Sequence, residues 1–156
     1  MTIDYTVSSL PALAFNSPAP LAWEKFAEIC GGDEAISAFL DGTKWADIET
    51  QLRNALVEAR GGEEKFKRPA RGCSVYWKKR VLDCFSEADV AKRDELIDRV
   101  WWDAAGELTD VSSPLGRGAL ATYAVRLKIA IRRTAISKDE GSAAFDRLTA
   151  TTKEVI

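Results

Sequence analysis

Apolar residues recur every three to four positions along most of the chain, which is the spacing of one face of an α-helix. The clearest example lies between Thr43 and the Gly61-Gly62 pair. Its apolar positions are Trp45, Ile48, Leu52, Leu56 and Ala59. This pattern predicts an amphipathic helix of roughly four to five turns that ends at the glycines.

The same spacing predicts helices on both sides of this segment. One begins near Pro20 and ends at Gly31-Gly32, and a short one runs from Asp33 to Leu40. Ser86 has the hydroxyl of an N-cap, and Ser137 with Glu140 has the spacing of a capping box. That box predicts a break between the last two helices. The later segments with helical spacing are 75–85, 86–108, 115–136 and 144–155.

Two segments do not follow the helical pattern. Residues 1–20 hold three prolines and little charge, and Tyr5-Thr6-Val7 has the β-branched and aromatic content of an extended segment. Residues 63–72 are the least periodic, and we interpret them as a connector. No region alternates polar and apolar residues over several strands. We therefore expect one all-α domain over residues 1–156, a compact bundle of about six to seven helices with a short extended N-terminal segment.

The composition narrows the chemistry that this fold is able to support. The chain has 156 residues, a net charge of −2 and no histidine. The absence of histidine excludes Ser-His and Cys-His nucleophile pairs and every histidine-ligated metal. The cysteines, Cys30, Cys73 and Cys84, are odd in number and form no C-x-x-C pair, so we expect reduced thiols. We predict no catalytic site, no cofactor, no metal and no small-molecule substrate.

No stretch reaches the roughly 18 consecutive apolar residues that cross a bilayer. The first residues also lack the basic and apolar regions of a signal peptide. We expect a cytoplasmic protein, and docking at the inner face of the plasma membrane through a membrane assembly stays open.

Acidic and basic residues separate between two successive predicted helices. Residues 86–110 carry eight acids against three bases, whereas residues 111–138 carry six bases and no acid. Two helices joined by a short loop pack antiparallel, so the two charge sets are able to face each other. One interpretation is that these charges only solvate and orient the hairpin. The other is that bases on the second helix stay free for an acidic partner.

A second basic cluster surrounds two aromatic residues, Tyr76 and Trp77. Its bases are Lys65, Lys67, Arg68, Arg71, Lys78, Lys79 and Arg80, and no acid occurs between Lys65 and Asp83. Cations that neutralise phosphates, beside rings that stack on bases, suit RNA or DNA, so a nucleic-acid-binding module using residues 65–80 is the alternative function. An isoelectric point near 5.3 argues against it and favours a solvated connector or a protein-docking surface.

Other candidate residues have a simpler structural interpretation. Cys73 and Cys84 would be the nucleophiles of a small enzyme, but no histidine is present to activate them. The G-x-G at Gly116 and Gly118 follows no strand, which argues against a phosphate loop. The Trp101-Trp102 pair is more often core plus rim than a ligand cage, and the other interpretation is that Trp102, about 100° from its neighbour around a helix, marks a contact surface. The residues that we predict to contact a protein partner are Lys78, Lys79, Arg80, Trp102, Arg126, Arg132 and Arg133.

Three segments of the chain resemble sequence motifs of one known family. Residues 5–15, YTVSSLPALAF, followed by Trp23 and Phe26, resemble its opening LVASLPxLxF. Residues 99–108, RVWWDAAGEL, resemble its R-x-R-W-D-x-L-x-E-L segment, and residues 120–129, LATYAVRLKI, resemble its L-x-A-Y-x-L-K-L-x-I helix. The family is a bacterial one of unknown function whose genes lie among those of V-type ATPases.

The resemblance implies a role similar to that of the C (d) subunit of rotary ATPases. That subunit is an all-helical, non-catalytic piece that links the soluble central stalk to the membrane rotor ring. The expected partners are therefore V-type ATPase subunits of the central stalk or rotor ring, and the expected function is structural or assembly-related.

Overall fold

The fold is built entirely from helices within the part of the chain that is described. A computed structural model describes residues 2–72 and 74–155, with the backbone alone from residue 138 onward. The α-helices are α1 (Ile3–Ser9), α2 (Trp23–Cys30), α3 (Asp33–Asp41), α4 (Trp45–Ala59), α5 (Val75–Cys84), α6 (Val90–Ala105) and α7 (Arg117–Val155). Two short 3₁₀ helices are η1 (Glu64–Phe66) and η2 (Gly106–Leu108). The all-α prediction of six to seven helices is confirmed.

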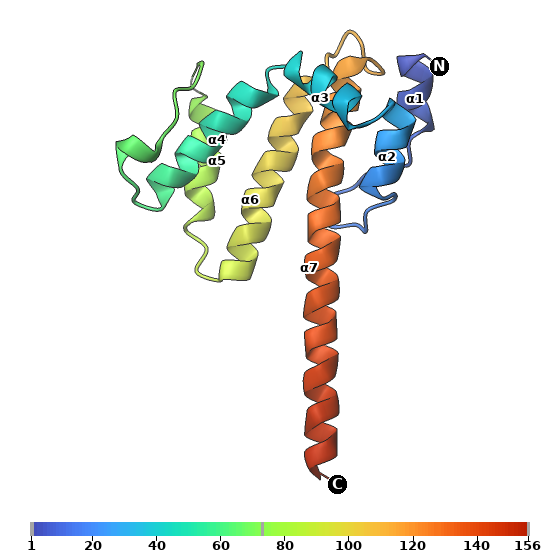
Figure 1. Ribbon diagram of the computed structural model, residues 1–156. Helices are drawn as coiled ribbons and strands as arrows, with labels where there is room; N and C mark the ends of the chain where they lie inside the picture. Colours follow the sequence, from blue (N-terminus) through green and yellow to red (C-terminus); the bar gives the residue numbers. More distant parts are fainter. Residues whose placement is uncertain (1, 73, 156) are drawn as a thin grey trace.

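The first half of α7 is the central element of the fold. Figure 1 shows it between α6 on one side and α2 on the other. Ala121, Val125 and Ile129 face a core shared with α4, α5, α6 and η2. Leu120, Ala124 and Leu127 face a second core shared with α2 and α3. One helix therefore joins the two halves of the hydrophobic core, because apolar residues cover more than one of its faces.

The predicted break at Ser137 and Glu140 is wrong. Helix α7 runs without interruption from Arg117 to Val155, and its C-terminal half extends away from the other helices (Figure 1). A Ser-x-x-Glu sequence forms a capping box only where the backbone before the helix is not helical. No proline interrupts the helix here, so the backbone continues through Ser137 and Glu140. The one glycine in this stretch, Gly141, costs only about 1 kcal/mol inside a helix. The side chains of the predicted terminal helix lie outside the described residues.

The predicted extended segment at the N-terminus is also partly wrong, because residues Ile3 to Ser9 form α1. Thr6 is buried and donates from its hydroxyl to the Thr2 carbonyl oxygen over 3.1 Å. Val7 packs beside the second core. Packing against α7 overrides the strand preference of the Tyr-Thr-Val run, since strand propensity depends strongly on surroundings. Between α1 and α2 the chain is an irregular loop.

The ends of two helices follow short polar side chains. Ser74 caps α5 by accepting a hydrogen bond from the backbone N–H of Trp77, over 3.3 Å. Asp89, rather than the predicted Ser86, caps α6 by accepting from the Ala91 N–H over 2.9 Å. Both are residue types that satisfy free N–H groups at a helix start.

The connector over residues 63–72 contains η1 and is bound to α4 by two amide side chains. Asn54 donates to the Arg68 carbonyl oxygen over 2.7 Å and accepts from the Arg68 N–H over 2.9 Å. Gln51 donates to the Arg71 carbonyl oxygen over 2.7 Å and accepts from the Ser74 N–H over 3.1 Å. The side-chain amides satisfy backbone N–H and C=O groups that have no secondary-structure partner. The backbone of the connector is therefore held in one conformation although its sequence has no helical periodicity.

Candidate partner-binding surface

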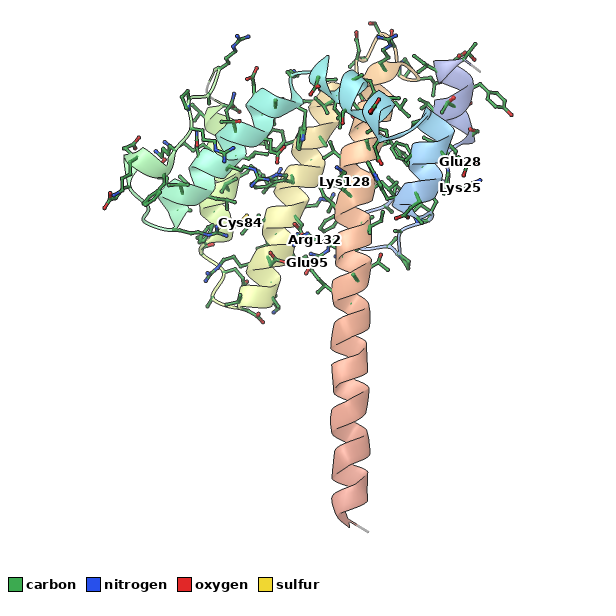
Figure 2. The ribbon with its side chains drawn as sticks, in the orientation of Figure 1. Lys25, Glu28, Cys84, Glu95, Lys128 and Arg132 are labelled. Carbon is green, nitrogen blue, oxygen red and sulfur yellow. The ribbon has the colours of Figure 1, made fainter. Side chains whose placement is uncertain are left out.

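The acidic helix α6 and the basic helix α7 meet along a charged seam. Asp98, whose side chain is only 8% exposed, accepts a hydrogen bond from Arg133 over 2.8 Å and also contacts Arg132. Arg132 lies 3.9 Å from Asp94 as well. Figure 2 shows Arg132 between the two helices, near Glu95. The interpretation in which these charges orient the hairpin therefore accounts for Arg132 and Arg133.

Burial is the main influence on Asp98. Removal from water raises the pKa of its carboxyl above the ordinary value, although the hydrogen bond from Arg133 and the charge of Arg132 favour the ionised form. A charge in this position needs its partners, because an unpaired buried carboxylate would be strongly disfavoured. Asp98 thus serves as an internal anchor for two of the arginines predicted to meet a partner.

Trp102 is a core residue, and its prediction as a contact surface is wrong. It is 6% exposed and packs edge-on against Phe15, with ring centroids 5.6 Å apart. Arg126 donates from Nε to the Trp102 carbonyl oxygen over 3.0 Å and lies 5.2 Å from the Trp102 ring centre. Burial lowers the pKa of Arg126 from its ordinary value. The rotation of about 100° between Trp101 and Trp102 points Trp102 toward the core. Because Arg126 contacts Trp102, its guanidinium is also engaged inside the molecule.

Two of the three predicted cations on α5 are likewise engaged within the chain. Arg80 donates to Asp103 of α6 over 3.0 Å. Lys78 lies 3.1 Å from Glu58 of α4, and Lys67 of the connector lies 3.5 Å from the same carboxylate. These ion pairs link α4, α5, α6 and the connector. They leave Lys79 as the one predicted cation that is exposed and makes no ion pair among the described residues.

Lys79 stands on an outward face that we call the α5 surface. This surface comprises Val75, Tyr76 and Lys79 of α5 together with Arg68 and Arg71 of the connector, all of them exposed. The helical spacing over residues 75–85 places Val75 and Tyr76 among the apolar positions of this helix without assigning them to its exposed side. The signal was present: Trp77, Val81 and Cys84 follow the helical interval and form the buried stripe, which leaves positions 75, 76 and 79 outside it.

Burial suppresses the reactivity of both described thiols, and at Cys84 it outweighs the charge of Arg80, which favours the thiolate. Cys84 is buried, and burial raises the pKa of its thiol, which donates to the Arg80 carbonyl oxygen over 3.2 Å. Burial also raises the pKa of the Cys30 thiol. A raised pKa lowers the fraction of reactive thiolate at neutral pH. Cys73, the other predicted candidate, lies outside the described residues.

A cleft of about 550 Å³ lies between the loop before α2, the start of α6 and the middle of α7. Its charged lining residues are Lys92, Asp94, Glu95 and Arg133. Glu95 contacts Asn16, Asp94 lies beside Arg132, and Arg133 binds Asp98, so three of these four are held by protein partners. The cleft therefore has the character of a gap between packed elements. No group of metal-binding side chains occurs among the residues that the structure describes.

Comparison with known proteins assigns no family to this chain. Across the described residues, none of the helices combines the length and the apolar character needed to span a bilayer. Neither a protein-family model, nor a curated protein, nor a solved structure matches this chain.

Proposed function

We propose that this protein is a non-catalytic structural or assembly subunit associated with a bacterial V-type ATPase. In this role it links the central stalk and the membrane rotor through protein–protein contacts. The proposal starts from the three segments that resemble the ATPase-associated family, residues 5–15, 99–108 and 120–129.

The observation that carries the proposal is that these three segments pack on one another. Phe15 of the first meets Trp102 of the second, with ring centroids 5.6 Å apart. Tyr123 of the third donates from its hydroxyl to the Pro11 carbonyl oxygen of the first over 2.8 Å. Arg126 of the third donates to the Trp102 carbonyl oxygen. The three segments that resemble the family therefore share one contact region, although they lie far apart in the sequence.

The charge arrangement also supports a structural role. The seam between α6 and α7 uses its charges to hold helices together, and the cleft beside it brings no set of reactive side chains to one point. Helix α7 provides 39 residues of continuous rod, and its C-terminal half extends past the other helices (Figure 1). A rod anchored at one end suits a piece that spans two parts of an assembly.

Purification of the ATPase from the cells that produce this chain tests the proposal. The full chain carries an affinity tag, membranes are solubilised in mild detergent, and the bound proteins are identified by mass spectrometry. We expect V-type ATPase subunits at a constant ratio to the tagged chain. A tagged Leu127→Asp variant, which disrupts the buried core, is the control and should recover none. Intact V-type ATPase purified without this chain, together with a tagged chain that recovers no ATPase subunit, would overturn the proposal.

A further inference from the structure

We infer that the α5 surface is a docking site for an acidic, amphipathic helix of a partner protein. The inference deepens the proposed function and rests on it for the identity of the partner, but the chemistry of the partner follows from the surface itself. The surface consists of Val75, Tyr76, Lys79, Arg68 and Arg71, as defined above.

The apolar part of this surface is open to solvent. Val75 is 78% exposed and Tyr76 is 60% exposed. Val75 and Lys79 are four residues apart, and Tyr76 and Lys79 are three apart, so all three share one face of α5. An exposed valine beside an exposed tyrosine and a lysine stem offers contiguous apolar contact area.

The connector adds positive charge to the same region. Gln51 bonds both the Arg71 carbonyl oxygen and the Ser74 N–H, which places Arg71 beside the first turn of α5. Asn54, one turn further along α4, holds Arg68 in the same way. Because the backbone is bound at both places, these arginine side chains start from defined positions.

No ion pair neutralises the cations of this surface within the described part of the chain, and the acids that share a pocket with Arg71 are Asp47 and Glu107. Arg68, Arg71 and Lys79 make no ion pair with any residue there, whereas Lys67 and Lys78 are paired with Glu58. Asp83, four residues after Lys79, is the first acid on the same face of α5. The positively charged part of this face therefore ends before Asp83. A complementary partner carries acids opposite these cations and an apolar stripe opposite Val75, which describes an acidic amphipathic helix.

The same features argue against nucleic acid as the occupant. The basic segment holds three rings, and Trp77 among them is 7% exposed, so only Phe66 and Tyr76 are available for stacking on a base. Glu58 lies between Lys67 and Lys78 and would repel a phosphate there. Val75 neither pairs with a phosphate nor stacks on a base. A protein partner accounts for the apolar and the charged residues together.

Site-specific photo-cross-linking tests the inference with the full chain in the cells that produce it. The photoreactive residue p-benzoylphenylalanine replaces Tyr76 in one variant and Tyr5 in another, because both tyrosines are 60% exposed. Cross-linked peptides are identified by mass spectrometry. We expect the probe at position 76, and not the probe at position 5, to capture one protein segment in which acids and apolar residues alternate at helical spacing.

Charge reversal supplies the second measurement. Arg71→Glu with Lys79→Glu, added to the probe at position 76, should lower the cross-link yield about tenfold, since like charges then face each other. The matched control is Lys25→Glu on α2, an exposed lysine on the other side of α7 (Figure 2), which should leave the yield unchanged. Far-ultraviolet circular dichroism checks that each variant keeps its helical content.

Each outcome decides between the inference and the proposed function. An acidic segment of a V-type ATPase subunit supports both. An acidic segment of another protein supports the docking site and contradicts an ATPase subunit as the partner of this surface, and co-purification then decides the proposed function by itself. Capture of RNA or DNA, capture of a segment without acids, a yield that charge reversal leaves unchanged, or no cross-link from position 76 would overturn the inference. If ATPase subunits still co-purify in those cases, the proposed function stands and uses another surface.

Discussion

The Asp98 carboxylate on α6 accepts a hydrogen bond from the Arg133 guanidinium on α7 over 2.8 Å, at a point where the aspartate side chain is only 8% exposed. Arg132 contacts the same carboxylate. One acid therefore binds two successive bases of the basic helix and fixes the antiparallel pairing of α6 and α7. Charges in this seam act mainly on the stability of the fold.

Replacing Asp98 should destabilise the protein more than replacing its neighbour Asp94. Asp98→Ala removes the carboxylate partner of the partly buried Arg133 and leaves it Asn16 as an acceptor, and we expect a loss of about 1–3 kcal/mol in the free energy of unfolding. Asp94 is 48% exposed and lies 3.9 Å from Arg132, so Asp94→Ala should cost less than about 0.5 kcal/mol. Urea denaturation measures both. Equal losses in the two variants would contradict the anchoring role of Asp98.

The close crossing between the start of α7 and η2 depends on Gly118. A β-carbon at this position would overlap the Leu108 carbonyl oxygen. Gly118→Ala should therefore lower the free energy of unfolding by about 1–3 kcal/mol, because the backbone has to move apart. Gly42→Ala is the control, since a β-carbon there would lie 3.7 Å from the nearest atom, the Phe39 carbonyl oxygen, and should be tolerated. Thermal unfolding of both variants checks this, and an unchanged melting temperature for Gly118→Ala would refute it.

Glu58 should make the attachment of the connector sensitive to acid. The hydrogen bond from Lys78 lowers the pKa of Glu58 from its ordinary value of 4.5. A lowered pKa means that the ionised form stabilises the fold, so this stabilisation is present above pH 4.5 and is lost as the pH falls through the lower folded-state pKa. Glu58→Gln should flatten the dependence of the urea midpoint on pH below 4.5. Glu34→Gln, at an exposed glutamate outside these ion pairs, should keep the wild-type dependence.

Tyr123 should make the free energy of unfolding depend on pH in the alkaline range. Burial raises the pKa of its hydroxyl to about 12 from the ordinary 10.0, and the hydroxyl donates to the Pro11 carbonyl oxygen. The protonated form is the stabilising one, so its contribution is complete below pH 10.0 and is lost as the pH rises through about 12.

Tyr123→Phe should therefore cost about 1 kcal/mol at neutral pH and remove this part of the alkaline dependence. Urea denaturation between pH 8 and pH 12 provides the measurement. Tyr5→Phe is the control, because Tyr5 is exposed. This substitution should leave the stability at neutral pH and its alkaline dependence unchanged. A Tyr123→Phe variant with wild-type stability at all pH values would show that the hydrogen bond to Pro11 contributes nothing.

Local spacing was sufficient to predict the helical class, the position of α4 and the opposed charges of α6 and α7. Helical periodicity and the stop signals of glycine pairs act over a few residues, so they can be read directly from the chain. The short loop between the two helices predicted an antiparallel hairpin, in which the acidic and basic residues face each other. The basic segment 65–80 was also visible as a cluster without acids.

Only the tertiary structure decided which face of each helix is covered and which cation meets which acid. Trp102 is buried because Phe15 and Arg126 come to it from distant segments, and Lys78 is neutralised by Glu58 on another helix. The formation of α1 likewise depends on packing against α7. These contacts join residues far apart in sequence, and local propensity carries no information about them. The packing therefore engages six of the seven predicted contact residues within the chain, and it leaves Lys79 exposed and without an ion pair among the described residues, with Val75 and Tyr76 exposed beside it.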